Sequence, residues 1–144
     1  MHQQPLVIDE NPTRADVEAL SDLITEFNFE ATDLRDGRLL ASLVRNGEGE
    51  LVAGMYGWTW GGCCEIEYLW VHEDQRKQGL GARLLEAAEQ EAADRHCRQV
   101  VLSTHSFQAP GFYRRFGYEV VGEIEDYPVG HSKYFLRKKL GPPR

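Results

Sequence analysis

The chain has 144 residues, enough for one domain that buries roughly two-thirds of its unfolded surface. Hydrophobic residues make up 42% of it and charged residues 27%, a balance that excludes a disordered or fibrous protein. The net charge of −7 argues against nucleic acid as a partner, because duplex binding depends on neutralising phosphates with Lys and Arg.

The N-terminal part of the chain shows a strand pattern followed by a helix pattern. Leu6-Val7-Ile8 is a short apolar run ended by Asp9 and Pro12, and it predicts a first strand. Thr13 is suited to cap a helix. Apolar residues then recur at three- and four-residue steps, namely Val17, Leu20, Leu23, Ile24 and Phe27. This stripe predicts a helix that lays one face on a core.

Three strands are expected next. Leu39–Arg45 and Leu51–Trp60 are strand-like runs, and the Asn46-Gly47 turn between them is typical of a hairpin. Gly61-Gly62 then turns the chain into a third run, Cys63–Val71. The middle of the chain therefore predicts an antiparallel meander.

The second half of the chain adds two helices and three strands. An amphipathic pattern from Leu80 to about His96 predicts a long helix, and Val100–Leu102 a buried strand after it. A strand–helix–strand order implies that the two strands are parallel. The remaining elements are a short helix and two strands, at Gly111–Phe116, Tyr118–Glu125 and Ser132–Leu140. The order predicts one α/β domain with a mixed sheet over residues 1–144.

The cysteines and the apolar runs indicate in which cellular compartment the protein is expected. Cys63, Cys64 and Cys97 have neither the spacing of a disulfide framework nor that of a metal site, so we expect reduced thiols, no metal and a cytoplasmic protein. The N-terminus does not read as a signal peptide. Apolar runs fall short of the roughly 20 residues of a membrane helix, so we expect no membrane partner.

The loop Arg76-Lys77-Gln78-Gly79-Leu80-Gly81 lies between a predicted strand and a predicted helix. A helix N-terminus presents unpaired N–H groups and a positive dipole end, and so binds phosphate. Glycine lets the backbone approach the anion closely. The loop carries no Gly-Lys-Ser/Thr, which excludes a P-loop.

This loop resembles the Arg/Gln-x-x-Gly-x-Gly/Ala motif of the GNAT N-acetyltransferase family. Ile66–Val71 is similar to the family's fourth strand, and Ala109–Tyr118 to its second signature. The resemblance implies a mixed, mostly antiparallel central sheet flanked by helices and splayed between the fourth and fifth strands. It also implies acetyl-CoA as cosubstrate.

Cofactor contacts follow from the resemblance. The pantetheine arm would pair with Leu69, Trp70 and Val71. The pyrophosphate would lie on the loop and the helix start, at Arg76, Lys77, Gln78, Gly79, Leu80, Gly81 and Ala82. The family often carries Asn shortly after the fifth strand; Ser106 stands at that place, and its hydroxyl reaches less far.

Two residues are implied as catalytic. Tyr113 would be the general acid that protonates the leaving thiolate, and Glu67 the base that takes the proton of the amine. By strand alternation we expect Glu67 to share a face with Leu69 and Val71, and Glu65 to point the same way. Asp126, His131 and water stay alternatives for the base.

The leading interpretation is transfer of an acetyl group to a primary amine of a small molecule, by direct attack in a ternary complex. A second is acetylation of a protein N-terminus or lysine, which an open groove would favour over an enclosed pocket. A third is an acyl-CoA-binding module without turnover. Trp58 and Trp60 share a strand face, where they either line an acceptor pocket or pack in the core or in a homodimer interface.

Overall fold

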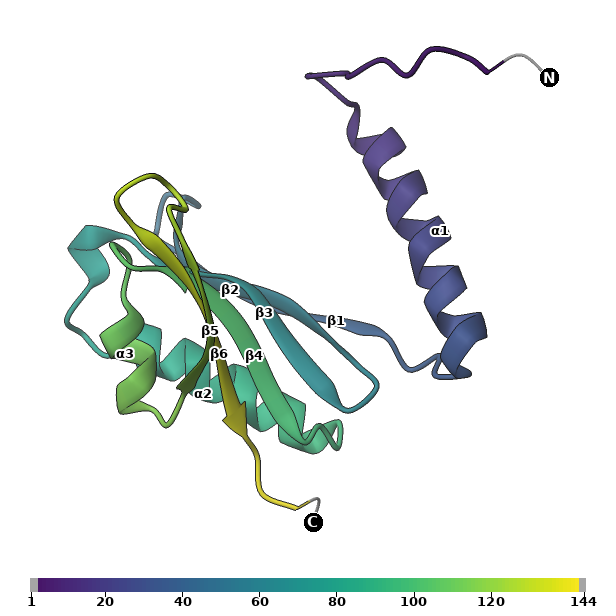
Figure 1. The fold of residues 1–144 in the computed structure, drawn as a ribbon. Coiled ribbons are helices and arrows are strands. Elements are labelled where there is room, and N and C mark those ends of the chain that lie inside the picture. The colour runs from purple at the N-terminus through teal and green to yellow at the C-terminus, as the bar shows by residue number, and fades with distance from the viewer. Residues whose placement is uncertain (1–2, 143–144) are drawn as a thin grey trace. The chain divides into compact units, whose positions relative to one another are not determined.

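The computed structural model describes residues 3–142 (Figure 1). The chain divides into two compact parts, one up to Arg35 and one from Asp36 onward. The single domain expected from the sequence stays a prediction. Among the described residues, no helix is both long and apolar enough to span a bilayer.

The first part contains helix α1, Arg14–Thr32. As predicted, Thr13 caps it: the Thr13 hydroxyl accepts a hydrogen bond from the backbone N–H of Asp16 at 3.1 Å. Its apolar stripe finds no packing partner within residues 3–35, so burial of that stripe stays a prediction.

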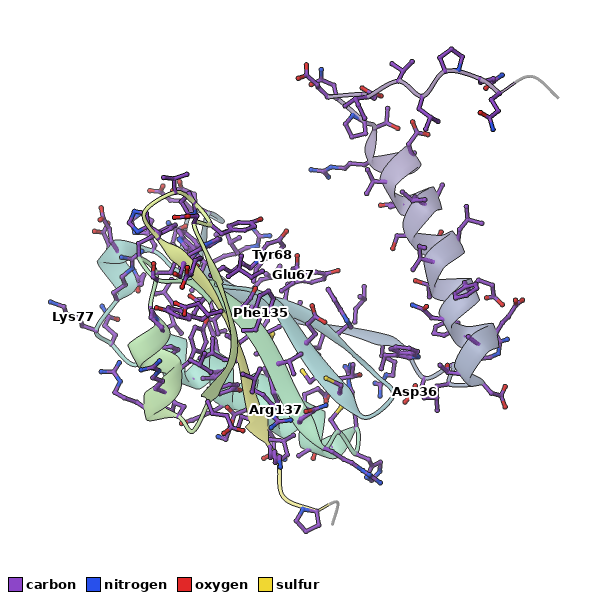
Figure 2. The ribbon with its side chains drawn as sticks, viewed as in Figure 1. Asp36, Glu67, Tyr68, Lys77, Phe135 and Arg137 are labelled. Atoms are coloured by element: carbon purple, nitrogen blue, oxygen red, sulfur yellow. The ribbon has the colours of Figure 1, made fainter. Side chains whose placement is uncertain are left out.

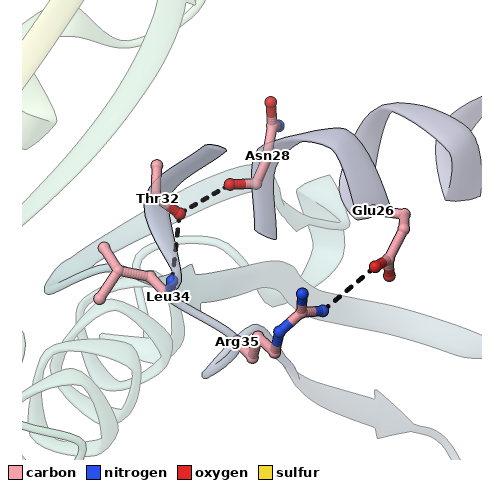
Figure 3. Close-up of polar contacts among 5 residues, drawn as sticks. All are labelled: Glu26, Asn28, Thr32, Leu34 and Arg35. Carbon is pink, nitrogen blue, oxygen red and sulfur yellow. Dashed lines mark hydrogen bonds and ion pairs between the residues drawn. The ribbon is translucent and has the colours of Figure 1, made fainter. Parts of the chain in front are cut away.

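The end of α1 is fixed by its own side chains (Figure 3). The Thr32 hydroxyl donates to the carbonyl of Asn28 at 2.6 Å and accepts from the N–H of Leu34 at 3.1 Å. Arg35 pairs with Glu26 at 3.2 Å. These contacts order the three residues that follow the helix.

The strand predicted at Leu6–Ile8 is not formed, and these three side chains are exposed. A strand exists only through hydrogen bonds to a neighbouring strand. All the strands of the described sheet come from residues 38–139. The apolar run was therefore insufficient evidence for a strand.

The second part is built on one sheet in the order β1-β2-β3-β4-β6-β5. Its strands are β1 Arg38–Arg45, β2 Leu51–Trp60, β3 Cys63–Val71, β4 Gln99–His105, β5 Glu119–Glu125 and β6 Ser132–Lys139. Neighbours are antiparallel except β3 and β4, which are parallel as predicted. The mixed, mostly antiparallel sheet expected from the family resemblance is confirmed.

Helix α2, Leu80–Asp94, covers one face of this sheet (Figure 1). Its buried residues form a single stripe, Leu84, Leu85, Ala88 and Ala92. They pack with inward side chains of the strands, among them Met55, Ile66 and Leu136. A 3₁₀ turn at Glu73–Gln75 precedes α2, and the short helix α3, Pro110–Arg115, follows β4. The Arg76–Gly81 loop thus lies at the start of α2, and the Ala109–Tyr118 segment follows β4.

Candidate active site

A cavity of about 950 Å³ lies where β3 and β4 separate. Its walls are the second half of β3, the loop and first turn of α2, the end of β4 and helix α3. The volume is at the upper end of the range for small-molecule and cofactor sites. The Arg76–Gly81 loop and the Ala109–Tyr118 segment therefore both contribute residues to the wall of one cavity.

Strand β3 carries a β-bulge at Glu67. Tyr56 of β2 pairs with Tyr68, but the next residue, Gly57, pairs with Ile66. Glu67 is left without a partner in β2. Bulges bend a strand and re-aim its side chains, and they are common beside active sites.

The bulge overturns the expectation that Glu65, Glu67, Leu69 and Val71 share one face. Before the bulge Ile66 points into the core, so Glu65 faces away from it. After the bulge Leu69 and Val71 pack against the core, while Tyr68 and Trp70 are exposed. Glu67 is the extra residue at the point where the register shifts; it is exposed and lines the cavity.

Strands β3 and β4 separate directly beside the bulge at Glu67. Their parallel pairing runs from Cys63 opposite Gln99 to Ile66 opposite Leu102, and stops there. Both strands continue, to Val71 and His105, and residues 67–71 of β3 and 103–104 of β4 line the cavity. The splay implied by the family resemblance is confirmed, and it leaves strand edges that an extended ligand can pair with.

The loop before α2 has the geometry of an anion site. Gly79 caps the helix with φ 77°, and Lys77 also adopts a left-handed conformation with φ 67°. The Arg76 side chain donates from Nε to the carbonyl of Val71 at 3.0 Å, which ties the loop to the end of β3. Lys77 projects outward (Figure 2). The first turn of α2 therefore offers backbone N–H groups with cations nearby.

Gly81 stands where the loop motif meets the second motif. A Cβ placed on Gly81 would lie 3.4 Å from Cζ of Phe112 in α3. Glycine at this position thus permits the close approach of α2 and α3, which brings the phosphate loop and the tyrosine-bearing helix to the same cavity.

Tyr113 lies on α3, is 8% exposed and lines the cavity. Its ring packs edge-on against Phe112 at 5.1 Å and Tyr118 at 5.9 Å. Burial raises the pKa of Tyr113 above its ordinary value. The phenol therefore keeps its proton through neutral and moderately alkaline pH, as a general acid requires.

The carboxylates near the bulge differ in environment. The pKa of Glu65 is raised by burial and, to a lesser extent, by the charge of Glu67. Asp126 and His131 are outside the described cavity lining. The His131 ring stands edge-on to Phe107 at 5.1 Å, and Phe107 does line the cavity.

Most of the predicted cofactor residues line the cavity: Leu69, Trp70, Val71, Arg76, Lys77, Gly79, Leu80, Gly81 and Ala82. Gln78 and Ser106 are not part of the lining that the structure describes. The Ser106 hydroxyl accepts a hydrogen bond from the N–H of Ser132 at 3.0 Å. Ser106 thus holds the start of β6.

Sequence reasoning did not assign Phe107, Gln108 and Phe112 to the site, yet all three line the cavity. The side-chain oxygen of Gln108 accepts from the N–H of His105 at 2.6 Å and from the Thr104 hydroxyl at 3.2 Å. It thereby fixes the loop that leads from β4 to α3. A glutamine two residues before Pro110, in the connection to the second motif, is the signal that points to this position.

The cysteines have the wrong environment for nucleophiles. Burial raises the pKa of the Cys63, Cys64 and Cys97 thiols, that of Cys64 to about 12. Since the thiolate is the nucleophile, these groups are poorly reactive. This favours direct attack over a covalent route.

The comparisons with known proteins agree with this geometry. Residues 7–118 match the model of the Acetyltransferase (GNAT) family. The chain therefore belongs to the GNAT family of acetyltransferases. Acetyl-CoA is the cosubstrate that this family uses.

Two curated proteins and one crystal structure are similar to this chain over much of its length. The chain is 41% identical over 96 residues to a blasticidin-S acetyltransferase of Streptomyces morookaense, covering 64% of this chain and 68% of that protein. It is 30% identical over 122 residues to an acetyltransferase of Agrobacterium fabrum, covering 85% of this chain and 89% of that protein. A crystal structure of an acetyltransferase from Bacillus cereus has a TM-score of 0.75 at 35% identity, covering 93% of this chain and 98% of that one.

Proposed function

We propose that this acetyltransferase moves the acetyl group of acetyl-CoA to a primary amine of a small molecule, by direct attack in a ternary complex. One observation carries the proposal: the phosphate loop, the unpaired edge of β3, Tyr113 and Glu67 all border one cavity.

The cavity fits acetyl-CoA in shape and charge. The first turn of α2 suits the pyrophosphate, because its N–H groups and dipole favour an anion. Lys77 and Arg115, which also lines the cavity, add positive charge. The backbone edge of β3 between Leu69 and Val71 suits the amide-bearing pantetheine arm. When bound, acetyl-CoA supplies a thioester that an amine can attack.

Two side chains of this protein, Tyr113 and Glu67, carry out the two proton transfers of the proposed reaction. Tyr113 donates its phenolic proton to the departing sulfur, and burial keeps that proton in place until it is needed. Glu67, at the exposed bulge, accepts the proton of the incoming ammonium through water. An amine titrating near 10.4 is otherwise mostly protonated at neutral pH.

A small-molecule acceptor is supported by the name of the Streptomyces morookaense relative, which acts on blasticidin S. Charge supports a cationic acceptor, because Glu67 is an exposed carboxylate that lines the cavity. A protein N-terminus as acceptor would be supported instead by faster turnover on peptides than on any small amine.

Glu67→Gln tests the base. We expect kcat/KM of the wild type to rise with pH, because the neutral amine is the nucleophile. The variant should lose activity near neutrality and regain part of it at high pH, where the amine deprotonates unaided. The measurement is the pH profile of both proteins on one amine.

Glu65→Gln is the matched control, since Glu65 is two residues away on the same strand but outside the described cavity lining. It should keep the wild-type profile. If Glu67→Gln keeps that profile as well, the base is Asp126, His131 or water.

A further inference from the structure

Gly57 of β2 stands opposite the bulge at Glu67. We propose that Gly57 is a positioning residue: because it has no side chain, β3 can bulge at Glu67 and separate from β4. Where this concerns the role of Glu67 in proton transfer, it rests on the proposed function.

Among the described glycines, Gly57 has the tightest surroundings. A Cβ at this position would overlap the carbonyl oxygen of Glu65, and would lie 3.0 Å from the Glu65 carbonyl carbon and from Cα of Ile66. All three are backbone atoms of β3. In a regular sheet Cβ stands off the pleat and does not meet the neighbouring backbone. No side-chain rotation relieves such an overlap.

Gly54 supplies the comparison within the same strand. A Cβ at Gly54 would lie 3.1 Å from Cδ2 of Leu43 and 3.3 Å from the carbonyl oxygen of Ser42. The nearer atom is the end of a flexible side chain, and the backbone oxygen of Ser42 needs to give by only a few tenths of an ångström. Gly54 therefore tolerates a methyl group at small cost, whereas Gly57 requires β3 itself to move.

The backbone that would move is the part of β3 on which the site depends. Ile66 forms the last parallel pair with Leu102 before the strands separate, and Glu67 follows it directly. Displacing residues 65–66 shifts both the bulge and the start of the cavity. A misplacement of about 1 Å can cost a catalytic step roughly 100-fold.

The first experiment compares Gly57→Ala with Gly54→Ala. In Gly57→Ala we expect kcat at neutral pH to fall roughly 100-fold, with partial recovery at high pH as in Glu67→Gln. Gly54→Ala should stay within a few-fold of wild type. A wild-type rate and pH profile in Gly57→Ala would overturn the proposal.

The second experiment removes the bulge and does not depend on catalysis. Deleting Glu67 makes the β2–β3 register continuous, because Tyr68 then follows Ile66 directly. Gly57→Ala should lower Tm by about 5 °C or more in the wild-type background and by much less in the deletion background. An equal loss in both backgrounds, or no loss in either, contradicts the proposal.

Folding failure is also informative. If Gly57→Ala does not fold alone but folds with Glu67 deleted, the bulge is the cause and the proposal holds. If it folds in neither background while the deletion alone does fold, the proposal is wrong. A wild type without transferase activity on amines would refute the proposed function, while the Tm comparison would still decide the role of Gly57.

Discussion

Tyr113→Phe is expected to lower kcat by roughly 10²–10⁴ while leaving affinity for CoA unchanged. The substitution removes only the hydroxyl, so the ring contacts with Phe112 and Tyr118 remain. The lost step is protonation of the leaving sulfur, for which burial has kept the phenol in its acid form. Turnover and calorimetric CoA binding, measured on the same preparation, separate chemistry from cofactor affinity.

Tyr118→Phe is the matched control. Tyr118 is 3% exposed and neighbours Tyr113, but its hydroxyl donates to Glu89 at 2.9 Å, a carboxylate that also pairs with Lys138 at 2.7 Å. Removing this hydroxyl should cost stability, about 1.5–3 kcal/mol for a hydrogen bond to a charged group, and leave kcat within a few-fold. Equal turnover in Tyr113→Phe and wild type would show that water or another group supplies the proton.

Gly79→Glu is expected to weaken CoA binding at least about 100-fold, because it places a carboxylate where the first turn of α2 should meet phosphate. The structure leaves room for the side chain, since a Cβ at Gly79 meets nothing within 4 Å. The effect should therefore be electrostatic and should shrink as salt screens the charges. Titration calorimetry at two salt concentrations measures both.

Gly79→Ala separates charge from backbone strain. Gly79 has φ 77°, so any side chain costs about 1–2 kcal/mol of folding stability there. Alanine carries that strain without the charge, and should bind CoA far more tightly than Gly79→Glu does. Unchanged CoA affinity in Gly79→Glu would show that the pyrophosphate does not bind at this loop.

Local patterns in the sequence predicted most of the fold. The Asn46-Gly47 turn, the alternation along β2 and the apolar stripe of α2 each follow from neighbouring residues, and each is present in the structure. Leu6–Ile8 shows the limit of such patterns. An apolar run becomes a strand only when another strand pairs with it, and no residue of the run itself specifies that partner.

The candidate site was predicted less completely, for the same reason. Tyr113 and most of the phosphate loop line the cavity as expected, because their motifs are contiguous in sequence. The expected face of Glu65 was wrong, since alternation assumes an unbroken ladder and the β2–β3 register shifts at Glu67, opposite Gly57. Ser106 was assigned by position alone, whereas its hydroxyl is engaged by the N–H of Ser132 on β6.

Initial-rate kinetics of thiol release from acetyl-CoA, with the acetylated product identified by mass, test the proposed reaction most directly. A panel of small cationic amines and a peptide with a free N-terminus would serve as acceptors. We expect acetylation of a small amine, with rates that depend on both substrates and give intersecting double-reciprocal lines. Parallel lines would indicate a covalent acetyl-enzyme. CoA binding without transfer to any acceptor would instead indicate a binding module, and either result would contradict direct transfer to a small-molecule amine.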